Sequence, residues 1–393
     1  MSALPSTTDI HQRGGYVSFV PRADIRRVTA QRRAPLARTR LPLSYPCLRV
    51  FTTAKLAEVE PAMITDDFNC ARYRAGQAAG HYESYFQRAN HPTRPQAFWV
   101  RYTIFSPAGR PRDAIGELWA VVFNGDTGRH VVAKSEVPID RCAFSNDQLA
   151  VRIADSELAP GVLVGRAGSL SNGITWNLGY RGGTAPVFDL PLGRYDGSFP
   201  KAKALVGVPM ARFTGAMTLN DEALAIDNWV GSQNHNWGAQ HTDRYAWGQV
   251  CGFDDAPDSF LETASARLRI GPIWSKLITP LVLRHAGKEF ACNSLWQGLR
   301  ARASYDYFHW RFDSKNKSAQ IEGEIRAPRE AFVGLRYYNP PGGVKYCLNS
   351  KIASCTLHVT DFSTGRTETL RAANRAAFEI LTDDADHGIG ICA

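Results

Sequence analysis

Hydrophobic and polar residues alternate along much of the chain, and the period of two is clearest at residues 97–105. One face of that segment carries Phe98, Val100, Tyr102 and Ile104, and the other carries Trp99, Arg101, Thr103 and Phe105. This period, with its β-branched and aromatic residues, is typical of a β-strand. Residues 116–123 repeat it after a Pro-Ala-Gly turn signal, so the two segments are predicted to form a hairpin with two well-filled faces.

The same alternation returns at regular intervals toward the carboxyl end. It recurs at residues 186–190, 211–219, 245–253, 260–270, 307–312, 320–326, 351–360 and 376–381. Turn signals such as Gly-Gly at 182–183 and Asn-Asp at 220–221 separate most of these segments, and no long amphipathic helix lies between them. The pattern predicts an all-β protein of antiparallel sandwiches or closed barrels, with few short helices.

A change of composition predicts the domain organisation. Residues 161–203 are dense in Gly, Pro and polar residues, which favours one domain at 65–200 and a second at 201–393. The first 40 residues hold eight arginines, no lysine and two acids, with almost no apolar periodicity. Residues 1–64 are therefore predicted to be a disordered basic tail.

Charge and composition exclude several classes of protein. The net charge is +9, and the first 40 residues supply 8 − 2 = +6 of it, leaving only +3 for the other 353 residues. Without a basic cluster on the folded part, no nucleic-acid partner is expected. The sequence shows no secretory signal and no run of about 18 apolar residues, so we expect a cytoplasmic protein without an integral membrane segment. The eight scattered cysteines show no metal-binding spacing.

The richest polar cluster spans residues 228–248, with three Trp, two His, three Asn and two Gln. A strand there would place Gln233, His235 and Trp237 on one face and Asn234 and Asn236 on the other. These groups suit the lining of a small-molecule cavity. Equally, the amides could satisfy loop backbone while the tryptophan plugs one end of a barrel.

Other chemistry at this cluster has weaker support. His235, His241 and Asp243 are metal-ligand types, but their spacing matches no compact ligand set, so no metal is expected. A Ser232, His235 and Asp243 triad can be drawn, although no nucleophile-elbow motif accompanies it. Glycine-rich phosphate loops are missing from the sequence, so no nucleotide cofactor is expected.

A second polar cluster occupies residues 80–92, where His81, Glu83 and Tyr85 share one predicted strand face. Inside an aromatic cavity, Glu83 would have a raised pKa and could donate a proton. The alternative, which we favour, is an ion pair of Glu83 with Arg88 or Arg101. Glu117 and Glu262 lie in similar strand settings, and the same two interpretations apply to them.

These motifs together resemble a known family. Asn-His-Asn-Trp-Gly at 234–238 and Tyr-Ala-Trp-Gly at 245–248, with Glu-Ser-Tyr-Phe at 83–86 and Ala-Phe-Trp at 97–99, resemble the lipocalin-like superfamily of carotenoid 1,2-hydratases, tocopherol cyclases and AttH-type proteins. The resemblance covers residues 70–390 and implies two lipocalin-like β-barrel domains. In that family a His-x-Trp element opens the second domain.

The resemblance also implies a function and a set of site residues. It implies a cofactor-independent cyclase, hydratase or isomerase acting on a hydrophobic terpenoid, carotenoid or polyketide-like substrate. A non-catalytic carrier or sensor of hydrophobic molecules is the alternative. Relatives often have an acid where this chain has Ala246, so another group would have to donate the proton. The predicted catalytic residues are His235, Asp243 and Glu83, and the predicted substrate-binding residues are Trp237, Asn234, Asn236, Gln233, His241, Tyr245, Trp247, Tyr85, Trp99 and Trp119.

Overall fold

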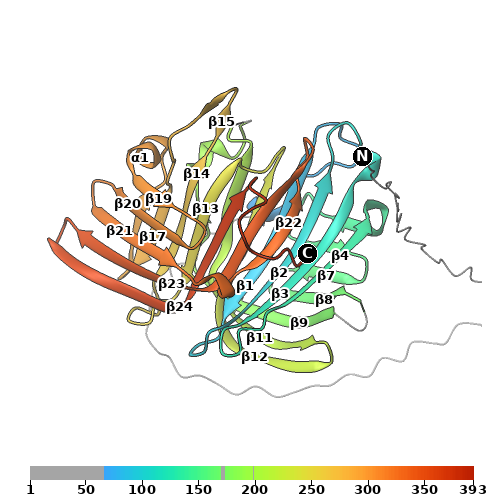
Figure 1. Cartoon of the computed structure of the whole chain (residues 1–393), viewed down its shortest axis with the longest axis horizontal. Helices are drawn as coiled ribbons and strands as arrows, with labels where there is room; N and C mark the ends of the chain where they lie inside the picture. Colours follow the sequence, from blue (N-terminus) through green and yellow to red (C-terminus); the bar gives the residue numbers. More distant parts are fainter. Residues whose placement is uncertain (1–65, 170–172, 198) are drawn as a thin grey trace, which may run out of the picture. The chain divides into compact units, whose positions relative to one another are not determined.

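The computed structural model describes residues 66–393, apart from 170–172 and 198. The predicted basic tail at 1–64 lies outside these residues. Two large antiparallel sheets dominate the described part of the chain, one in its first half and one in its second half (Figure 1). The predicted all-β class is therefore confirmed.

The first sheet contains twelve strands. In spatial order they run β4-β3-β2-β1-β12-β11-β9-β8-β7-β6-β5, and β10 pairs with β11. Their bounds are β1 (His81–Asn90), β2 (Gln96–Ser106), β3 (Ile115–Asn124), β4 (Val131–Pro138), β5 (Cys142–Phe144), β6 (Val151–Ile153), β7 (Ser156–Ala159), β8 (Val162–Gly168), β9 (Gly173–Gly182), β10 (Val187–Phe188), β11 (Ala202–Leu219) and β12 (Glu222–Gly238).

The second sheet contains ten strands, and its order is β18-β17-β14-β13-β24-β23-β21-β20-β19, with β22 on β23. Their bounds are β13 (Arg244–Cys251), β14 (Phe260–Arg267), β17 (Leu281–His285), β18 (Lys288–Cys292), β19 (Arg302–Tyr305), β20 (His309–Lys315), β21 (Ala319–Arg326), β22 (Val333–Tyr338), β23 (Val344–Asp361) and β24 (Arg366–Thr382). A separate small hairpin joins β15 (Arg269–Ile270) to β16 (Ile273–Trp274).

Helices are short in the part of the chain that is described. The α-helix α1 (Leu295–Arg300) begins with a capping box at Ser294. The remaining helical turns are 3-10 helices: η1 (Asp66–Asn69), η2 (Pro111–Asp113), η3 (Ile139–Arg141), η4 (Leu192–Arg194) and η5 (Arg329–Ala331). Crossing a bilayer takes a longer and more apolar helix than any found among the described residues.

The two sheets share one plan of connection. In each sheet the first strand of the chain pairs with the last one, β1 with β12 and β13 with β24. Each sheet also ends in a long hairpin whose strands have 18 and 17 residues. The chain therefore changes sheets between Gly238 and Arg244, in the segment that joins β12 to β13.

This change of sheets differs from the domain boundary at 200/201 that composition predicts. The Gly- and Pro-rich stretch instead precedes the β11–β12 hairpin, which returns to the first sheet and pairs with β1. Because that pairing joins residues about 150 positions apart, local composition carries no sign of it. The His-x-Trp element correspondingly ends the last strand of the first sheet rather than opening the second sheet.

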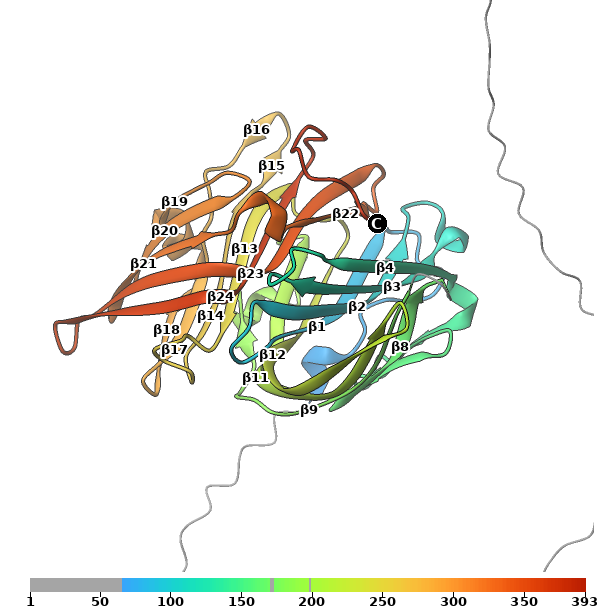
Figure 2. The ribbon, with the colours of Figure 1, turned by 60° about the horizontal axis from the view of Figure 1, so that its bottom comes forward.

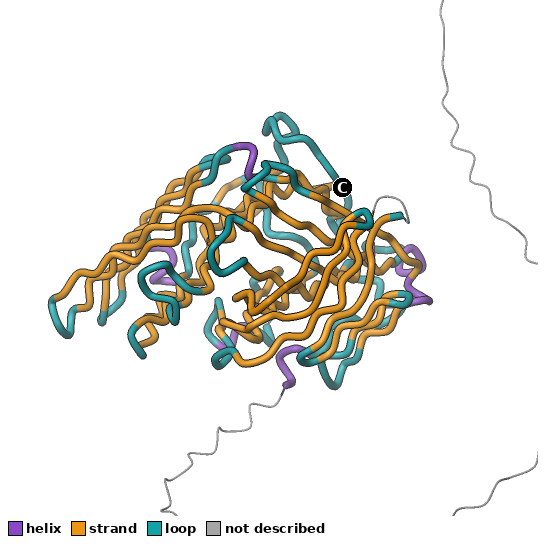
Figure 3. The backbone as a smooth tube through the Cα atoms, turned by 90° about the horizontal axis from the view of Figure 1, so that it is seen from below, coloured by secondary structure: helices purple, strands orange, loops and turns teal. Residues whose placement is uncertain are grey.

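Two large apolar cores and a smaller third cluster pack the sheets in the described part of the chain. The first sheet curls on itself, and the backbone N–H of Gly168 on β8 donates to Ser135 Oγ on β4 at 2.9 Å (Figures 2 and 3). The enclosed core includes Phe98, Trp176 and Phe213. Trp99 and Trp119 point to the opposite face of β2 and β3 and pack in the core of the second sheet. Alternation along the strands thus fills both faces of the first sheet, as predicted.

Candidate functional site

A cavity of about 510 Å³ is lined by residues of both sheets. Its size and mixed lining are typical of small-molecule sites. The first sheet contributes Tyr82, Phe86, Trp99, Arg101, Asn234, His235 and Asn236, and the second contributes Tyr245, Trp247, Glu262, Ala264, Tyr337 and Glu379. Residues of the 189–200 loop and of α1 complete the wall.

The structure divides the residues predicted to form a site into two groups. The cavity lining includes His235, Asn234, Asn236, His241, Tyr245, Trp247 and Trp99. Outside the lining lie Glu83, Asp243, Gln233, Trp237, Tyr85 and Trp119. Alternation on β12 explains much of this division, because Asn234 and Asn236 face the second sheet while Gln233 and Trp237 face the interior of the first.

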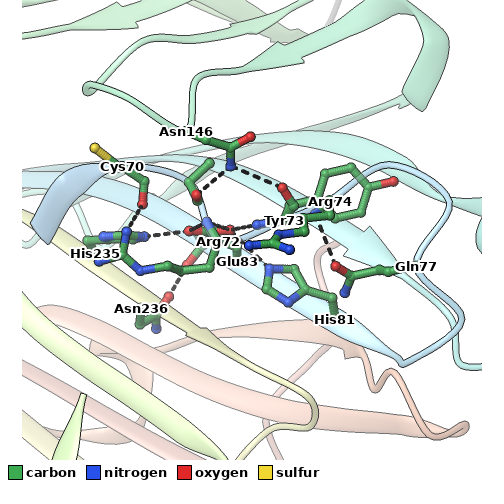
Figure 4. A network of polar contacts seen from close by, with 12 residues as sticks. Cys70, Arg72, Tyr73, Arg74, Gln77, His81, Glu83, Asn146, His235 and Asn236 are labelled. Carbon is green, nitrogen blue, oxygen red and sulfur yellow. Dashed lines mark hydrogen bonds and ion pairs between the residues drawn. The ribbon is translucent and has the colours of Figure 1, made fainter. Parts of the chain in front are cut away.

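Glu83 is fully buried at the centre of a hydrogen-bond network beside the cavity (Figure 4). Its carboxylate accepts hydrogen bonds from the backbone N–H groups of Arg72 and Tyr73, all at 2.9 Å. His235 Nε2 lies 2.8 Å from Oε1, and His81 Nε2 lies 3.0 Å from Oε2. The network fastens the segment before β1 onto the first sheet.

The hydrogen bonds around Glu83 correct both interpretations of this residue, the proton donor with a raised pKa and the ion pair with an arginine. Burial alone would raise the pKa of Glu83, but hydrogen bonds and charge from His235 and His81 outweigh it and hold the pKa at about 2. Its ion-pair partners are thus histidines rather than Arg88 or Arg101. An acid that ionises so readily cannot serve as a proton donor at neutral pH, so Glu83 is a structural anchor.

The imidazole of His235 connects this anchor to the cavity. Its Nδ1 lies 3.0 Å from the carbonyl oxygen of Phe68 and its Nε2 faces Glu83, so both nitrogens meet acceptors. The ring also stacks on Tyr85, with centroids 4.2 Å apart. His235 is therefore held rigidly, and the residue is part of the cavity lining.

The other predicted residues outside the lining have packing or anchoring contacts. Asp243 Oδ2 accepts the backbone N–H of Arg269 at 2.8 Å, which holds the start of β15. Trp119 packs against Tyr337 in the core between the sheets. The triad of Ser232, His235 and Asp243 does not form, because Ser232 Oγ donates to Gln249 at 2.7 Å instead.

His241 lines the cavity as a neutral ring. It stacks on Tyr82 with centroids 4.0 Å apart, and Tyr337 lies 5.7 Å from it. Burial, together with the positive charge of Arg101, lowers the pKa of His241 to about 3. A ring that remains uncharged at neutral pH contributes an aromatic surface and a hydrogen-bonding edge to the wall.

Two acids in the cavity lining, Glu262 and Asp189, have raised pKa values, and only Glu262 was considered from the sequence. Glu262 on β14 is 3% exposed, and its two oxygens accept hydrogen bonds from Trp247 Nε1 at 2.5 Å and Gln249 Nε2 at 2.9 Å. Burial, and then the negative charge of Asp189, raise the pKa of Glu262 well above its usual range. Glu262 thus has the raised pKa that the sequence interpretation offered for Glu83.

Asp189 is the second acid, and it belongs to the loop between β10 and η4. Its Oδ1 is buried without a hydrogen-bond partner among the described residues. Burial raises the pKa of Asp189 to about 7. Asp189 lies in the alternating segment 186–190, but nothing in that pattern predicted a chemical role for it. Only folding of that loop over β11 and β14 places it beside Glu262.

Apolar side chains flank the wall where it meets solvent. Phe199, Leu295 and Trp296 all line the cavity and are 49%, 42% and 72% exposed. Large apolar side chains exposed together at the rim of a cavity are typical of ligand-entry sites. Among the described residues, no group of three His, Cys, Asp or Glu side chains is arranged to hold a metal ion.

Known proteins similar to this chain were found by sequence and by structure. No known family model matches the sequence. Two uncharacterized proteins from Mycobacterium tuberculosis, of strains CDC 1551 / Oshkosh and H37Rv, are each 24% identical over 279 residues, which is 70% of this chain and 80% of theirs. These relatives share most of the chain and have no assigned activity.

Solved structures give the fold. An AttH-like protein of Nitrosomonas europaea superposes with a TM-score of 0.51 at 13% identity, covering 84% of this chain and 99% of that one. Kievitone hydratase from Nectria haematococca has a TM-score of 0.49 at 12% identity, covering 81% and 96%. The resemblance to AttH-type proteins is therefore confirmed at the level of the fold.

Proposed function

We propose that the chain is an acid–base enzyme of the hydratase, cyclase or isomerase type, acting on a largely apolar substrate in the cavity between the sheets. The supporting observation is the pair of carboxyl groups, Glu262 and Asp189, in an aromatic cavity that raises both pKa values. Coupled carboxyl groups of this kind lose their protons in two separate steps. Burial thus favours the protonated form of Glu262, and Asp189, with a pKa of about 7, takes up and releases its proton near neutral pH.

Such a pair matches the chemistry that these reactions share. Isomerisation and cyclisation add a proton at one atom of the substrate and remove one from another, and hydration removes the second proton from water. Glu262 donates the first proton to an unsaturated carbon or a carbonyl oxygen. Asp189 accepts the second proton, so the two carboxyl groups end with the opposite protonation and exchange protons with solvent before the next cycle.

The surrounding residues suit an apolar guest with few polar atoms. Trp99, Trp247 and Phe86 supply aromatic surface, which favours burial of apolar area and stabilises developing positive charge by about 0.5–2 kcal/mol. Asn234 and Asn236 offer amide hydrogen bonds on the same wall. A largely apolar wall also strengthens electrostatic interactions with the reacting atoms.

Hydrogen exchange with solvent tests the proposal even while the product is unidentified. The protein is incubated in D2O with a panel of terpenoid, carotenoid and polyketide-like alkenes, and deuterium uptake into each is measured by mass spectrometry. We expect uptake with the native protein, and at least about a hundredfold less with Glu262→Gln. Asp243→Asn is the matched control, since this carboxylate lies outside the cavity, and it should retain full uptake.

Binding must be measured beside uptake, by tryptophan fluorescence with the same panel. Loss of uptake with retained binding in Glu262→Gln supports the enzyme. Binding of panel members by the native protein without any deuterium uptake would contradict it and favour the carrier. Equal uptake by the native protein and Glu262→Gln would also exclude this pair as the acid and base.

A further inference from the structure

Arg101 is a buried cation in the cavity wall. It is 4% exposed and projects from β2 toward the second sheet, next to Trp99 on the same strand. Its guanidinium lies 4.4 Å from the centre of the Tyr337 ring and 5.9 Å from that of Trp99. Its Nε is buried without a hydrogen-bond partner, and no ion pair reaches the group from the described residues.

Arg88, on the same face of the neighbouring strand, shows how this fold satisfies the terminal donors of a buried arginine, although its Nε also lacks a partner among the described residues. Its guanidinium donates to Gln249 Oε1 at 3.0 Å, to the carbonyl oxygen of Arg375 at 3.0 Å and to Asn90. Such hydrogen bonds offset the cost of burying a charge. Arg101 makes none of these bonds within the described part of the chain, so its unused donors face the cavity.

No carboxylate among the described residues makes an ion pair with Arg101. Burial would lower the pKa of Arg101, but the neighbouring groups, Tyr337 and then Glu117 foremost, outweigh it and raise that pKa. Glu117 is paired with Lys134 at 2.9 Å, and Glu379 is paired with Lys351 at 2.6 Å. The phenols beside it stay neutral, because burial raises the pKa of Tyr245 and of Tyr337 well above its usual range. His241 is uncharged as well. One positive charge in the cavity wall thus has no anionic partner of its own among residues 66–393 that the structure describes.

A buried, unpaired charge costs several kcal/mol unless a partner arrives. A guanidinium presents a planar fork of N–H donors that matches the two oxygens of a carboxylate. We propose that Arg101 binds the carboxylate of an otherwise apolar substrate, which makes the natural ligand an apolar carboxylic acid. This inference rests on the proposed function, in which Glu262 and Asp189 are the reacting groups, and adds the group that holds the carboxylate of the substrate.

Decanoate and decanol are suitable probes, because they share a chain and differ in the charge of the head group. Binding is measured by isothermal calorimetry on the whole protein at pH 8. We expect decanoate to bind at least about tenfold more tightly than decanol. Arg101→Gln should abolish that preference and leave decanol affinity within about twofold, while Arg101→Lys should retain part of it. Arg94→Gln, an exposed arginine near the start of β2, is the control and should change neither affinity.

The outcomes separate this inference from the proposed function. Equal affinities for decanoate and decanol in the native protein would overturn the inference, and this result needs no variant to fold. A preference that survives in a folded Arg101→Gln protein would overturn it too and would leave Arg101 as a packing residue against Tyr337. Glu262→Gln should keep the preference for decanoate over decanol. A negative deuterium experiment therefore does not contradict the carboxylate site, and equal affinities for decanoate and decanol do not contradict the proposed enzyme.

Discussion

Trp247 Nε1 donates a 2.5 Å hydrogen bond to Glu262 across the β13–β14 pair, and both side chains line the cavity. The same strand places Gln249 so that its amide reaches the other oxygen of Glu262 at 2.9 Å. Alternation on β13 thus aims two donors at one buried carboxyl group. The tryptophan that the sequence assigned to the substrate also fixes the orientation of an acid.

Replacing Trp247 by Phe should destabilise the protein by about 1–2 kcal/mol, because Glu262 then loses one of its two donors in a buried setting. The free energy of unfolding in urea measures the loss. Trp296→Phe changes the same residue type at a 72% exposed position and should stay within about 0.5 kcal/mol of the native protein. Equal effects of the two substitutions would show that the Trp247 bond contributes nothing.

Asp189 should lower stability as pH rises. A carboxyl group whose pKa is raised on folding, here from 3.8 to about 7, binds more protons in the native state than in the unfolded state between those values. Stability attributable to Asp189 is therefore intact below pH 4 and falls until pH 7 is passed. Asp189→Asn removes the buried charge, so it should match the native protein at pH 4 and exceed it by about 4 kcal/mol at pH 8.

Thermal unfolding at a series of pH values measures this difference. Asp255→Asn, a carboxylate 3.7 Å from Arg371 at the surface, is the control and should show no such rise with pH. A constant difference between Asp189→Asn and the native protein from pH 4 to pH 8 would contradict the burial of an ionising Asp189.

Glu83 should act in the opposite direction and at lower pH. Its folded pKa of about 2 lies below its usual value of 4.5, so its contribution is complete above pH 4.5 and is lost as pH falls toward 2. The shift corresponds to about 3 kcal/mol. Glu83→Gln should be destabilised by a similar amount at pH 7 and should lose less stability than the native protein between pH 4.5 and pH 2.

Urea unfolding at pH 7, 4 and 3 measures both effects. Glu289→Gln breaks an exposed pair with Arg284 and serves as the control, with a change of less than about 1 kcal/mol at each pH. If Glu83→Gln retained the stability of the native protein at pH 7, this would contradict the role of Glu83 as the anchor that holds residues 70–73 onto β1.

Strand periodicity predicted the fold more completely than it predicted the site. The segment 97–105 became β2, and the two faces expected for residues 233–237 are the two faces of β12. Side-chain direction on a strand follows from local alternation, so a sequence shows it. Pairing of β1 with β12 does not follow in this way, because it joins distant segments, and the boundary between the sheets lies near residue 240 as a result.

Glu83 and Glu262 show why the chemistry of the site could not be predicted from the sequence in the same way. Glu83 and Glu262 both alternate with aromatic residues on a strand, yet one meets two histidines and two backbone N–H groups, and the other meets an indole, an amide and a second acid. The neighbours that folding brings to each acid therefore lower the pKa of Glu83 and raise the pKa of Glu262. Asp189 lies in the alternating segment 186–190, but that alternation says nothing of its neighbours, since a loop residue acquires its environment only when the loop packs.

Turnover should follow a bell-shaped dependence on pH if Glu262 and Asp189 act as acid and base. The active form has one proton on the pair, so the rate rises as the pair loses its first proton near pH 7 and falls when Glu262 loses the second at higher pH. Asp189→Asn removes the rising limb and leaves a slower rate that falls only at high pH. Deuterium uptake from pH 5 to 10 measures both profiles, with Asp243→Asn expected to reproduce the native bell. A rising limb near pH 7 that persists in Asp189→Asn would assign that titration to another group and refute the role of Asp189 as base.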